Sequence, residues 1–221
     1  MTMAWWQNFD SPAAAWLRRV IMRHRDEGTL RSDRRLISVL YSNMRDYVPL
    51  CERLKDNPEQ LRALMNAYFT EMGEVVAKYN GTVEKYIGDC FSAVYNTPLA
   101  SPDHALDAVR TALDLQKRMP DFSRRWEARV GGAIRCGVGI STGAAVVITN
   151  GLMYTVMGDT MNLAPRLEGL TKEYKVPIVI SETTHQHLAG RIPTRELGDI
   201  VVKGTEQPVK VFAVLTSAGK V

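Results

Sequence analysis

Cysteine is scarce in this sequence, and no two cysteines have the spacing of a redox motif. The 221 residues include only Cys51, Cys90 and Cys136. An odd number of cysteines without a Cys-x-x-Cys pair is not the pattern of the disulfide frameworks found in secreted domains. We therefore expect three reduced thiols and a cytoplasmic protein.

Long apolar runs and the usual pattern of a nucleic-acid-binding surface are also missing. No apolar run approaches the roughly 18 residues that a membrane-spanning helix needs, and no secretory signal peptide is recognisable. No basic stripe alternates with aromatic residues, so we do not expect nucleic acid as a partner. The formal net charge of +4 is mild and fits an anionic ligand as well as a solvated surface.

The sequence has instead the composition of one soluble domain with a short appendage. Hydrophobic residues make up 45% and charged residues 24%, which is enough apolar material for a buried core. A length of 221 residues fits a single globular unit. We divide the chain into an N-terminal segment, residues 1–33, and a domain, residues 34–221.

Residues 1–33 are expected to form an amphipathic helix. Ser11-Pro12 is typical of a helix start, and five basic residues lie between residues 18 and 25. The apolar residues at helical spacing are Trp5, Trp6, Phe9, Ala13, Trp16, Leu17, Val20 and Ile21. Such a face most often packs on its own domain or on a dimer mate. The alternatives are an anionic membrane surface, which would make the protein membrane-associated, and a regulatory contact with another protein.

From residue 34 the pattern predicts alternating strands and helices, an α+β fold. Two helices are expected on either side of Asn57-Pro58, and a hairpin is expected around Gly88-Asp89. A further helix is expected over 102–119, and another follows residue 158. The expected strands are 36–41, 82–87, 90–95, two strands flanking 141–143, 178–180, 196–202 and 209–214. This order is β-α-β-β-α-β with additional strands and helices, a ferredoxin-like core.

One stretch, Tyr154 to Glu168, places two polar side chains on one helical face. A Gly-Asp turn leads into a helix in which Asn162 and Arg166 are four residues apart. A guanidinium is suited to clamping phosphate oxygens, and an amide can orient a hydroxyl beside it. The pair is therefore suited to phosphate oxygens with a hydroxyl or a ribose oxygen beside them.

A second stretch, Glu84 to Asp89, has the sequence Glu-Lys-Tyr-Ile-Gly-Asp and forms the predicted hairpin turn. Together the two stretches resemble the signature of class III nucleotide cyclases, which close ATP or GTP into a cyclic 3′,5′-monophosphate. The resemblance covers roughly residues 35–214. No Walker sequence and no Gly-Gly-Asp/Glu-Glu-Phe run is present, which argues against a P-loop NTPase and a diguanylate cyclase.

The resemblance implies two divalent ions, Mg²⁺ or Mn²⁺, held by carboxylates. Asp89 corresponds to one metal ligand. Asn43 stands where the family has the other metal aspartate, and Met44 corresponds to a backbone ligand. The loss of a negative charge predicts weakened metal binding and a slower reaction. Asp46, where the family usually has Gly, is an alternative carboxylate with a shifted position.

The resemblance also assigns the substrate contacts. Lys85 and Thr155 correspond to the residues that read the purine edge, and this pair favours adenine. Asn162 and Arg166 correspond to the ribose-orienting and transition-state-stabilising pair, and Lys203 to a lysine near the triphosphate. Pro165 departs from the family pattern, because a proline inside a helix removes a hydrogen bond and can alter the aim of Arg166.

Two functions follow from these residues. The first is an adenylate cyclase that converts ATP to cyclic AMP and pyrophosphate at a homodimer interface, with each site built from both chains. The second is a degenerate cyclase domain that binds nucleotide, or only dimerises, as a regulatory module. Two features carry no such chemistry: His185 and His187 point in different directions on a helix, and Gly137-x-Gly139 is a strand feature.

Overall fold

The protein is described here from a computed structural model, which defines residues 31–150, 153–201 and 208–216. Residues 1–30 lie outside this part, so the predicted N-terminal helix and the division of the chain after residue 33 stay predictions. The elements are β1 (Arg31–Met44), α2 (Tyr47–Arg53), α3 (Pro58–Lys78), β2 (Thr82–Ile87), β3 (Cys90–Tyr95), α4 (His104–Val130), β4 (Cys136–Asn150), β5 (Met153–Met157), α5 (Asp159–Glu173), β6 (Ile178–Ser181), α6 (Glu182–Leu188), β7 (Thr194–Ile200) and β8 (Val209–Val214).

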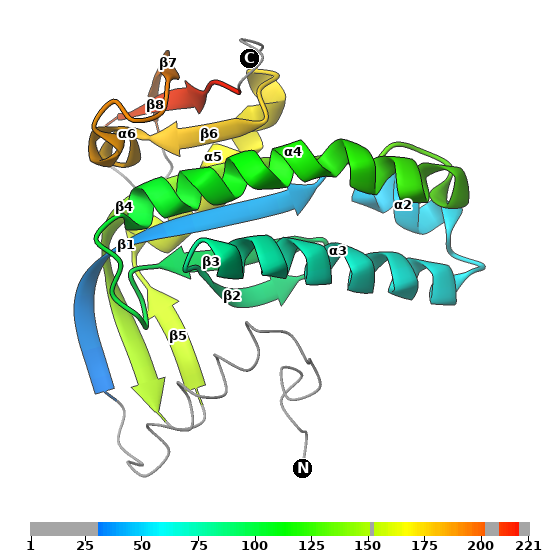
Figure 1. Ribbon diagram of the computed structural model, residues 1–221, viewed down its shortest axis with the longest axis horizontal. Helices are drawn as coiled ribbons and strands as arrows, with labels where there is room; N and C mark the ends of the chain where they lie inside the picture. The colour runs from blue at the N-terminus through cyan, green and yellow to red at the C-terminus, as the bar shows by residue number, and fades with distance from the viewer. Residues whose placement is uncertain (1–30, 151–152, 202–207, 217–221) are drawn as a thin grey trace.

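The strands form one eight-stranded sheet (Figure 1) in the order β2-β3-β1-β4-β6-β8-β7, with β5 paired to β4. Strand β3 lies between β1 and β2, and β1 is antiparallel to both β3 and β4. This is the interleaved arrangement of a β-α-β-β-α-β core. The predicted α+β, ferredoxin-like fold is confirmed, with β5 to β8 as the additional strands.

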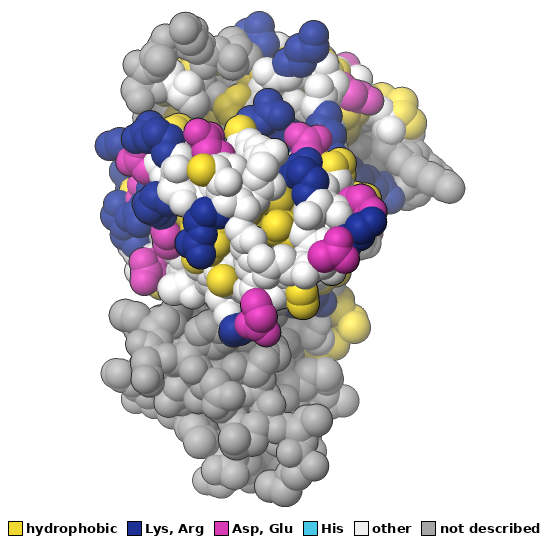
Figure 2. Space-filling model, turned by 90° about the vertical axis from the view of Figure 1, so that its right-hand side faces the viewer, with side chains coloured by type: hydrophobic (Ala, Val, Ile, Leu, Met, Phe, Trp, Pro, Cys, Tyr) yellow, Lys and Arg dark blue, Asp and Glu magenta, His cyan; other side chains and the backbone are white. Residues whose placement is uncertain are grey.

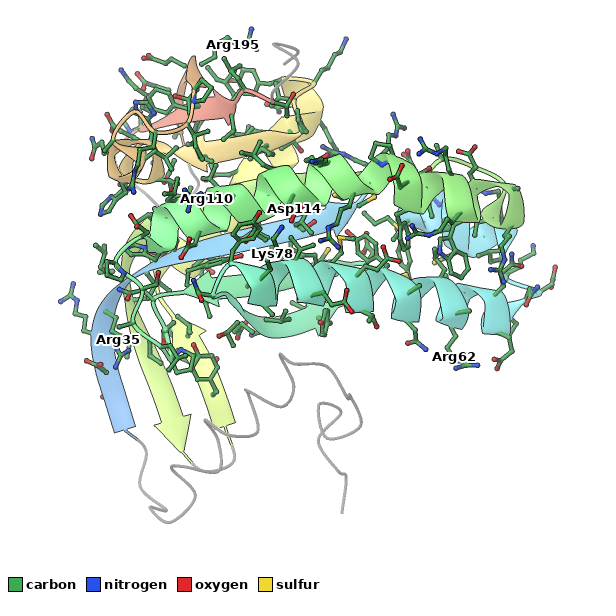
Figure 3. The ribbon with its side chains drawn as sticks, viewed as in Figure 1. Arg35, Arg62, Lys78, Arg110, Asp114 and Arg195 are labelled. Carbon is green, nitrogen blue, oxygen red and sulfur yellow. The ribbon has the colours of Figure 1, made fainter. Side chains whose placement is uncertain are left out.

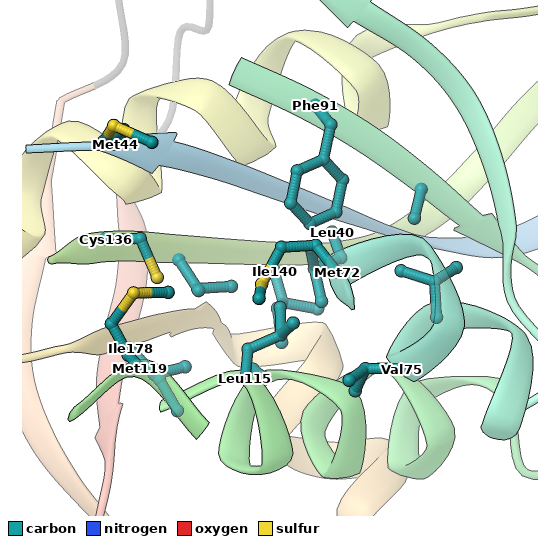
Figure 4. Packing of buried hydrophobic residues seen from close by; sticks show 14 of the residues in the cluster. Leu40, Met44, Met72, Val75, Phe91, Leu115, Met119, Cys136, Ile140 and Ile178 are labelled. Carbon is teal, nitrogen blue, oxygen red and sulfur yellow. The ribbon is translucent and has the colours of Figure 1, made fainter. Parts of the chain in front are cut away.

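The two faces of the sheet carry different helices. Along β1, Leu40 and Met44 belong to the main core beneath α3 and α4, whereas Ile37 and Val39 belong to a second core with Ala164 of α5. This alternation follows from the two-residue period of a strand. Figure 4 shows part of the main core. From Ile37 onward, β1 is therefore covered on both faces, which fixes the position of the residues at its C-terminal end.

Helices α3 and α4 are also joined at their surface. Lys78 of α3 pairs with Asp114 of α4 at 2.7 Å (Figure 3). Asp114 also contacts Arg118 at 3.4 Å on its own helix. The pKa of Asp114 is lowered, because hydrogen bonding to Lys78 and the nearby Arg118 outweigh the effect of burial. Partly exposed ion pairs of this kind contribute little to stability. The contact between α3 and α4 is therefore stabilised mainly by the apolar core below these pairs.

Glycines on β4 let α5 approach the sheet closely. A side chain at Gly139 would overlap the backbone of α5 at Ala164, and one at Gly137 would overlap the Glu168 carboxylate. Both positions are within β4, as predicted. Further along the strand, Gly143 leaves room for Thr160 of α5. The helix that carries Asn162 and Arg166 is thereby seated directly on the sheet.

Several predicted elements have other bounds in the structure: β1 extends beyond 36–41 at both ends, and β7 begins and ends two residues before the predicted 196–202. Residues 141–143 do not separate two strands, because β4 continues through them while Gly143 accommodates Thr160. Helix α4 does not end near Met119 but passes Pro120 and continues to Val130, because Phe122 and Trp126 are buried in the core. Strand β5 was not predicted. Within the described residues no helix has the length and apolarity to cross a bilayer.

Candidate functional site

The end of β1 and the β2–β3 turn lie side by side, as the fold class predicts. Gly88 has a φ of 60°, which permits the tight turn before Asp89. The Met44 N–H donates to the Asp89 carbonyl at 3.4 Å, and Asn43 is paired with Cys90 across the ladder. Met44 has its side chain in the core. The structure therefore brings Asn43, Met44 and Asp89 together.

Asn43 has an unusual environment. Its Oδ1 is buried and has no hydrogen-bond partner among the described residues. On the other side of β1 it faces Gly137, and the space above that glycine is occupied by the carboxylate of Glu168 from α5. Asn43 thus has a carboxylate neighbour on one side and the Asp89 turn on the other.

Glu168 is a buried acid that the sequence analysis did not identify. Burial raises its pKa, while Arg45 and Lys172 and hydrogen bonding with Asn43 and Thr171 act in the opposite direction. Arg45 Nη1 lies 3.4 Å from Glu168 Oε1, and Arg45 Nη2 donates to Thr171 Oγ1. A buried carboxylate beside Asn43 makes an additional negative charge at position 43 unfavourable unless a cation lies close to it.

The residues present fit a divalent ion only in part. The Asn43 amide oxygen, which has no hydrogen-bond partner among the described residues, and the Asp89 carboxylate are oxygen ligands of the kind that Mg²⁺ and Mn²⁺ accept. Only the carboxylate is charged, so these two ligands together provide a single negative charge. Within the described residues no group of three or more His, Cys, Asp and Glu side chains could hold a metal ion. The donor set fits a weak site that needs oxygen atoms from the substrate.

Asp46 does not replace the missing carboxylate in this structure. It has a φ of 57°, a left-handed conformation that glycine adopts more easily, and it is the first residue before α2. Its Oδ2 lies 3.2 Å from Arg135 Nη2. The carboxylate is therefore used in a surface ion pair.

A larger hollow of about 810 Å³ lies beyond Asp46, between α4, residues 133–136 and the end of α5. It is lined by basic and acidic side chains, including the Asp46–Arg135 pair. Figure 2 views the molecule from the α2 side, where Lys and Arg are mixed with Asp and Glu and apolar side chains are scattered. None of Lys85, Asp89, Asn162 and Arg166 lines this hollow.

A second cavity, of about 370 Å³, gathers the residues expected to contact the base and the ribose. Lys85 of β2 and Asn162 of α5 both line it. Its other lining residues are Tyr41, Glu84, Ile87, Ser92, Val156, Met157, Gly158, Met161 and Pro165. Thr155 is not among them, although Val156 and Met157 next to it are. The structure thus unites Lys85 with Asn162 but leaves Thr155 beside the cavity.

Helix α5 presents Asn162 and Arg166 to solvent. Both residues are exposed, while Ala164 and Leu167 between and after them are buried. Neither forms an ion pair or a side-chain hydrogen bond with another described residue. The helix continues through Pro165 without interruption, so the proline does not end it. Both side chains are available to a ligand.

The expected site is divided within one chain. Asn43 and Asp89 do not line the cavity that contains Lys85 and Asn162. Arg166 does not line it either, and Lys203 lies outside the described residues. Sequence reasoning missed Glu84 and Ser92, which line the cavity beside Lys85. The only sequence signal for Glu84 was an acidic residue directly before the lysine.

The chain is similar in sequence to known nucleotide cyclases. The adenylate and guanylate cyclase catalytic domain matches residues 31–216. Adenylate cyclase 1 of Rhizobium meliloti is 32% identical over 186 residues, which are 82% of this chain and 28% of the relative. An adenylate cyclase of Anabaena cylindrica is 29% identical over 191 residues, 81% of this chain and 37% of the relative. The chain thus spans about a third of the length of these relatives.

Solved structures of similar proteins include both nucleotide specificities. The adenylyl cyclase CyaB from P. aeruginosa has a TM-score of 0.76 at 30% identity, covering 85% of this chain and 97% of that one. The guanylyl cyclase Cya2 has a TM-score of 0.73 at 29% identity, covering 84% and 94%. Because the two are similarly close, the choice of base has to be argued from the residues of this chain.

Proposed function

This chain belongs to the adenylate and guanylate cyclase catalytic domain family, and we propose that it is an adenylate cyclase. The proposed reaction converts ATP to cyclic AMP and pyrophosphate: the ribose 3′-oxygen forms a bond to the α-phosphorus, and the bond from that phosphorus to pyrophosphate breaks. The observation that carries this proposal is the single cavity lined by Lys85 and Asn162, because it combines a base-reading donor with a ribose-orienting amide.

Lys85 is the residue that favours adenine. An ammonium group is a hydrogen-bond donor with no acceptor, so it can donate to N1 of adenine but not accept from the N1–H of guanine. Thr155, which is adjacent to the cavity lining, is proposed to complete the recognition with its hydroxyl. Its neighbours Val156 and Met157 already line that cavity.

Asn162 and Arg166 act on the reacting part of the substrate in this proposal. Asn162 orients the ribose, and Arg166 stabilises the charge that develops on the phosphate oxygens. Their exposure and lack of described partners support this role, because neither has to leave an existing interaction to reach the substrate. Lys203 is proposed to contact the triphosphate.

Asn43, the backbone of Met44 and Asp89 form the proposed metal half of the site. A divalent ion bound there would activate the attacking oxygen and neutralise the leaving phosphates. Asn43 contributes a neutral oxygen, and we propose that the resulting weak binding slows the reaction and favours Mn²⁺ over Mg²⁺.

A homodimer would join the two halves. Within one chain the metal half and the base-reading cavity do not share lining residues. Ile87 and Met157 at the cavity are exposed apolar side chains, which a second copy would cover. We propose that each active site combines Asn43 and Asp89 of one protomer with Lys85, Asn162 and Arg166 of its partner.

The second candidate is a regulatory module that binds nucleotide or only dimerises. Asn43 is the observation in its favour, because the metal half has lost a charge. The presence of Asn162 and Arg166, which have no side-chain partner among the described residues, favours the enzyme instead, since a domain without catalysis has no chemical need for them.

The test is cyclic nucleotide formation from ATP and from GTP by the purified chain. We expect cyclic AMP from the native chain and a loss of about a hundredfold or more in Arg166→Ala. Arg62→Ala is the matched control, because Arg62 forms an exposed helical ion pair with Glu59 away from the site. Lys85→Glu combined with Thr155→Cys should shift activity toward GTP. If ATP stays the sole substrate of that double variant, the base-reading assignment is wrong.

A further inference from the structure

Glu84 is a buried carboxylate in the wall of the cavity, and both of its oxygens are occupied. Its side chain is 1% exposed. Glu84 Oε1 lies 2.9 Å from Lys85 Nζ, and Glu84 Oε2 accepts a hydrogen bond from Ser92 Oγ at 2.8 Å. Burying a charge is unfavourable unless it is paired and hydrogen-bonded, and this arrangement meets both conditions.

A β-bulge brings Glu84 and Lys85 to the same cavity. In a regular strand, consecutive side chains point to opposite faces of the sheet. Between β2 and β3, however, Val83 pairs with Ala93 and Lys85 pairs with Ser92, so Glu84 is an extra residue on β2. Glu84, Lys85 and Ser92 consequently all line the cavity.

The contact restricts an otherwise flexible lysine. Lys85 is 48% exposed, and an exposed lysine samples many rotamers of its four-carbon stem. The ammonium has three N–H donors, so it can stay in its ion pair with Glu84 and still donate to a ligand in the cavity. Each carboxylate oxygen of Glu84 already has a partner, Oε1 in Lys85 and Oε2 in Ser92.

We propose that Glu84 is a positioning residue for base selection, which holds the Lys85 ammonium at the purine edge while Ser92 holds Glu84. This inference rests on the proposed function of Lys85. Glu84 acts through Lys85 and does not contact the reacting atoms. Removing its charge should weaken ATP binding and selectivity for ATP over GTP more than it slows turnover.

The test is a double-mutant cycle with Glu84→Gln, Lys85→Ala and the combination. We expect Glu84→Gln to lower the ratio of kcat/KM for ATP over GTP by roughly tenfold, mainly through KM for ATP. In the combined variant we expect no further loss beyond Lys85→Ala, because the effect of Glu84 passes through the lysine. Glu59→Gln, the same change in an exposed ion pair, is the matched control.

Two results would overturn the inference. One is a Glu84→Gln variant that loses kcat while KM and the nucleotide ratio stay unchanged, which is the behaviour of a purely structural residue. The other is a combined variant in which the fold-loss of the ATP-over-GTP ratio equals the product of the fold-losses in the two single variants. If Glu84→Gln does not fold, Ser92→Ala removes one contact of Glu84 and should shift the ratio in the same direction by roughly threefold.

Equilibrium binding separates this inference from the proposed function. The probes are 3′-deoxy-ATP and 3′-deoxy-GTP, which lack the attacking hydroxyl and cannot be cyclised. A native chain that makes no cyclic nucleotide but binds 3′-deoxy-ATP in preference, and loses that preference in Glu84→Gln, would refute the enzyme and support the positioning role. A native chain that binds both probes equally would refute the positioning role.

Discussion

Asn43 combines two properties with opposite consequences for catalysis. Its buried Oδ1 has no hydrogen-bond partner among the described residues, so an oxygen is free to contact a cation. Its side chain is neutral, however, and the nearby Glu168 is paired with Arg45 at 3.4 Å. The position can therefore support metal binding but contributes no charge to it.

Replacing Asn43 with Asp tests this environment through stability. Without divalent ions, Asn43→Asp should lower the free energy of unfolding by about 1–2 kcal/mol, because a second carboxylate would lie beside buried Glu168. Addition of Mn²⁺ should restore stability in the variant more than in the native chain. Urea unfolding with and without Mn²⁺ measures both effects.

Asn57→Asp is the matched control for that substitution. Asn57 is exposed and caps the N-terminus of α3 through its side chain, a position that Asp fills equally well. Its stability should not respond to Mn²⁺ differently from that of the native chain. Equal Mn²⁺ responses of native chain and Asn43→Asp would contradict the placement of a metal at residue 43.

Individual residues differed in how well the sequence predicted their placement. Asn43 and Asp89 were predicted to be neighbours because the topology alone puts the end of β1 beside the hairpin turn. Glu84 was not predicted, because its burial depends on a bulge that alternation does not reveal. Glu168 was missed because it reaches Asn43 only after α5 has packed over Gly137.

At the scale of elements, the close packing of α5 against β4 determines where Asn162 and Arg166 lie. Gly139→Ala should lower the free energy of unfolding by about 2–3 kcal/mol, since its methyl group would overlap the α5 backbone. Gly169→Ala in α5 is the counterpart, because nothing lies within 4 Å of the added carbon. It should raise stability by about 0.5–1 kcal/mol through helix propensity.

Chemical denaturation of these two glycine variants gives the comparison directly. Similar stability for Gly139→Ala and the native chain would mean that α5 does not approach β4 as closely as described. The activity of Gly139→Ala should also fall, because displacement of α5 misdirects both of its polar side chains.

The start of α4 contains a buried histidine that makes stability depend on pH. His104 Nδ1 is 2.8 Å from Ser38 Oγ, and its ring is 5.6 Å from that of His187. Burial, followed by the proximity of His187, lowers the pKa of His104. The unfolded chain therefore takes up the proton more readily than the folded one, and stability should fall as the pH drops below about 6.5.

Thermal unfolding between pH 8 and pH 5 tests this effect. His104→Gln keeps a polar group at the site and should flatten the pH dependence below about 6.5 while lowering stability at pH 8. An unchanged slope in His104→Gln would assign the pH dependence to other groups.

Local elements were predicted better than those that depend on distant contacts. The β2–β3 hairpin and β8 have the predicted bounds, because alternation and turn residues specify them locally. The continuity of β4 through Gly143 depends on Thr160 of α5. The passage of α4 through Pro120 depends on core contacts made by Phe122 and Trp126. Neither of these tertiary effects is visible in a local pattern.

At the scale of the whole molecule, each proposed site is formed by two chains. Mixing two inactive variants, a complementation experiment, tests this arrangement. Asp89→Ala and Arg166→Ala should each be inactive alone. When the two are mixed and allowed to exchange, half of the dimers contain one intact site of two, so about a quarter of native activity should return. Asp89→Ala mixed with Asn43→Ala should stay inactive, because both changes fall in the metal half.

The most direct measurement is the initial rate of cyclic AMP formation by the native chain and by Asn43→Asp, with Mg²⁺ and with Mn²⁺. We predict slow formation by the native chain, faster with Mn²⁺, and a rate at least about tenfold higher with Mg²⁺ in Asn43→Asp. No cyclic AMP from the native chain with either ion would contradict the proposed enzyme. Activity restored only by Asn43→Asp would identify a regulatory module instead.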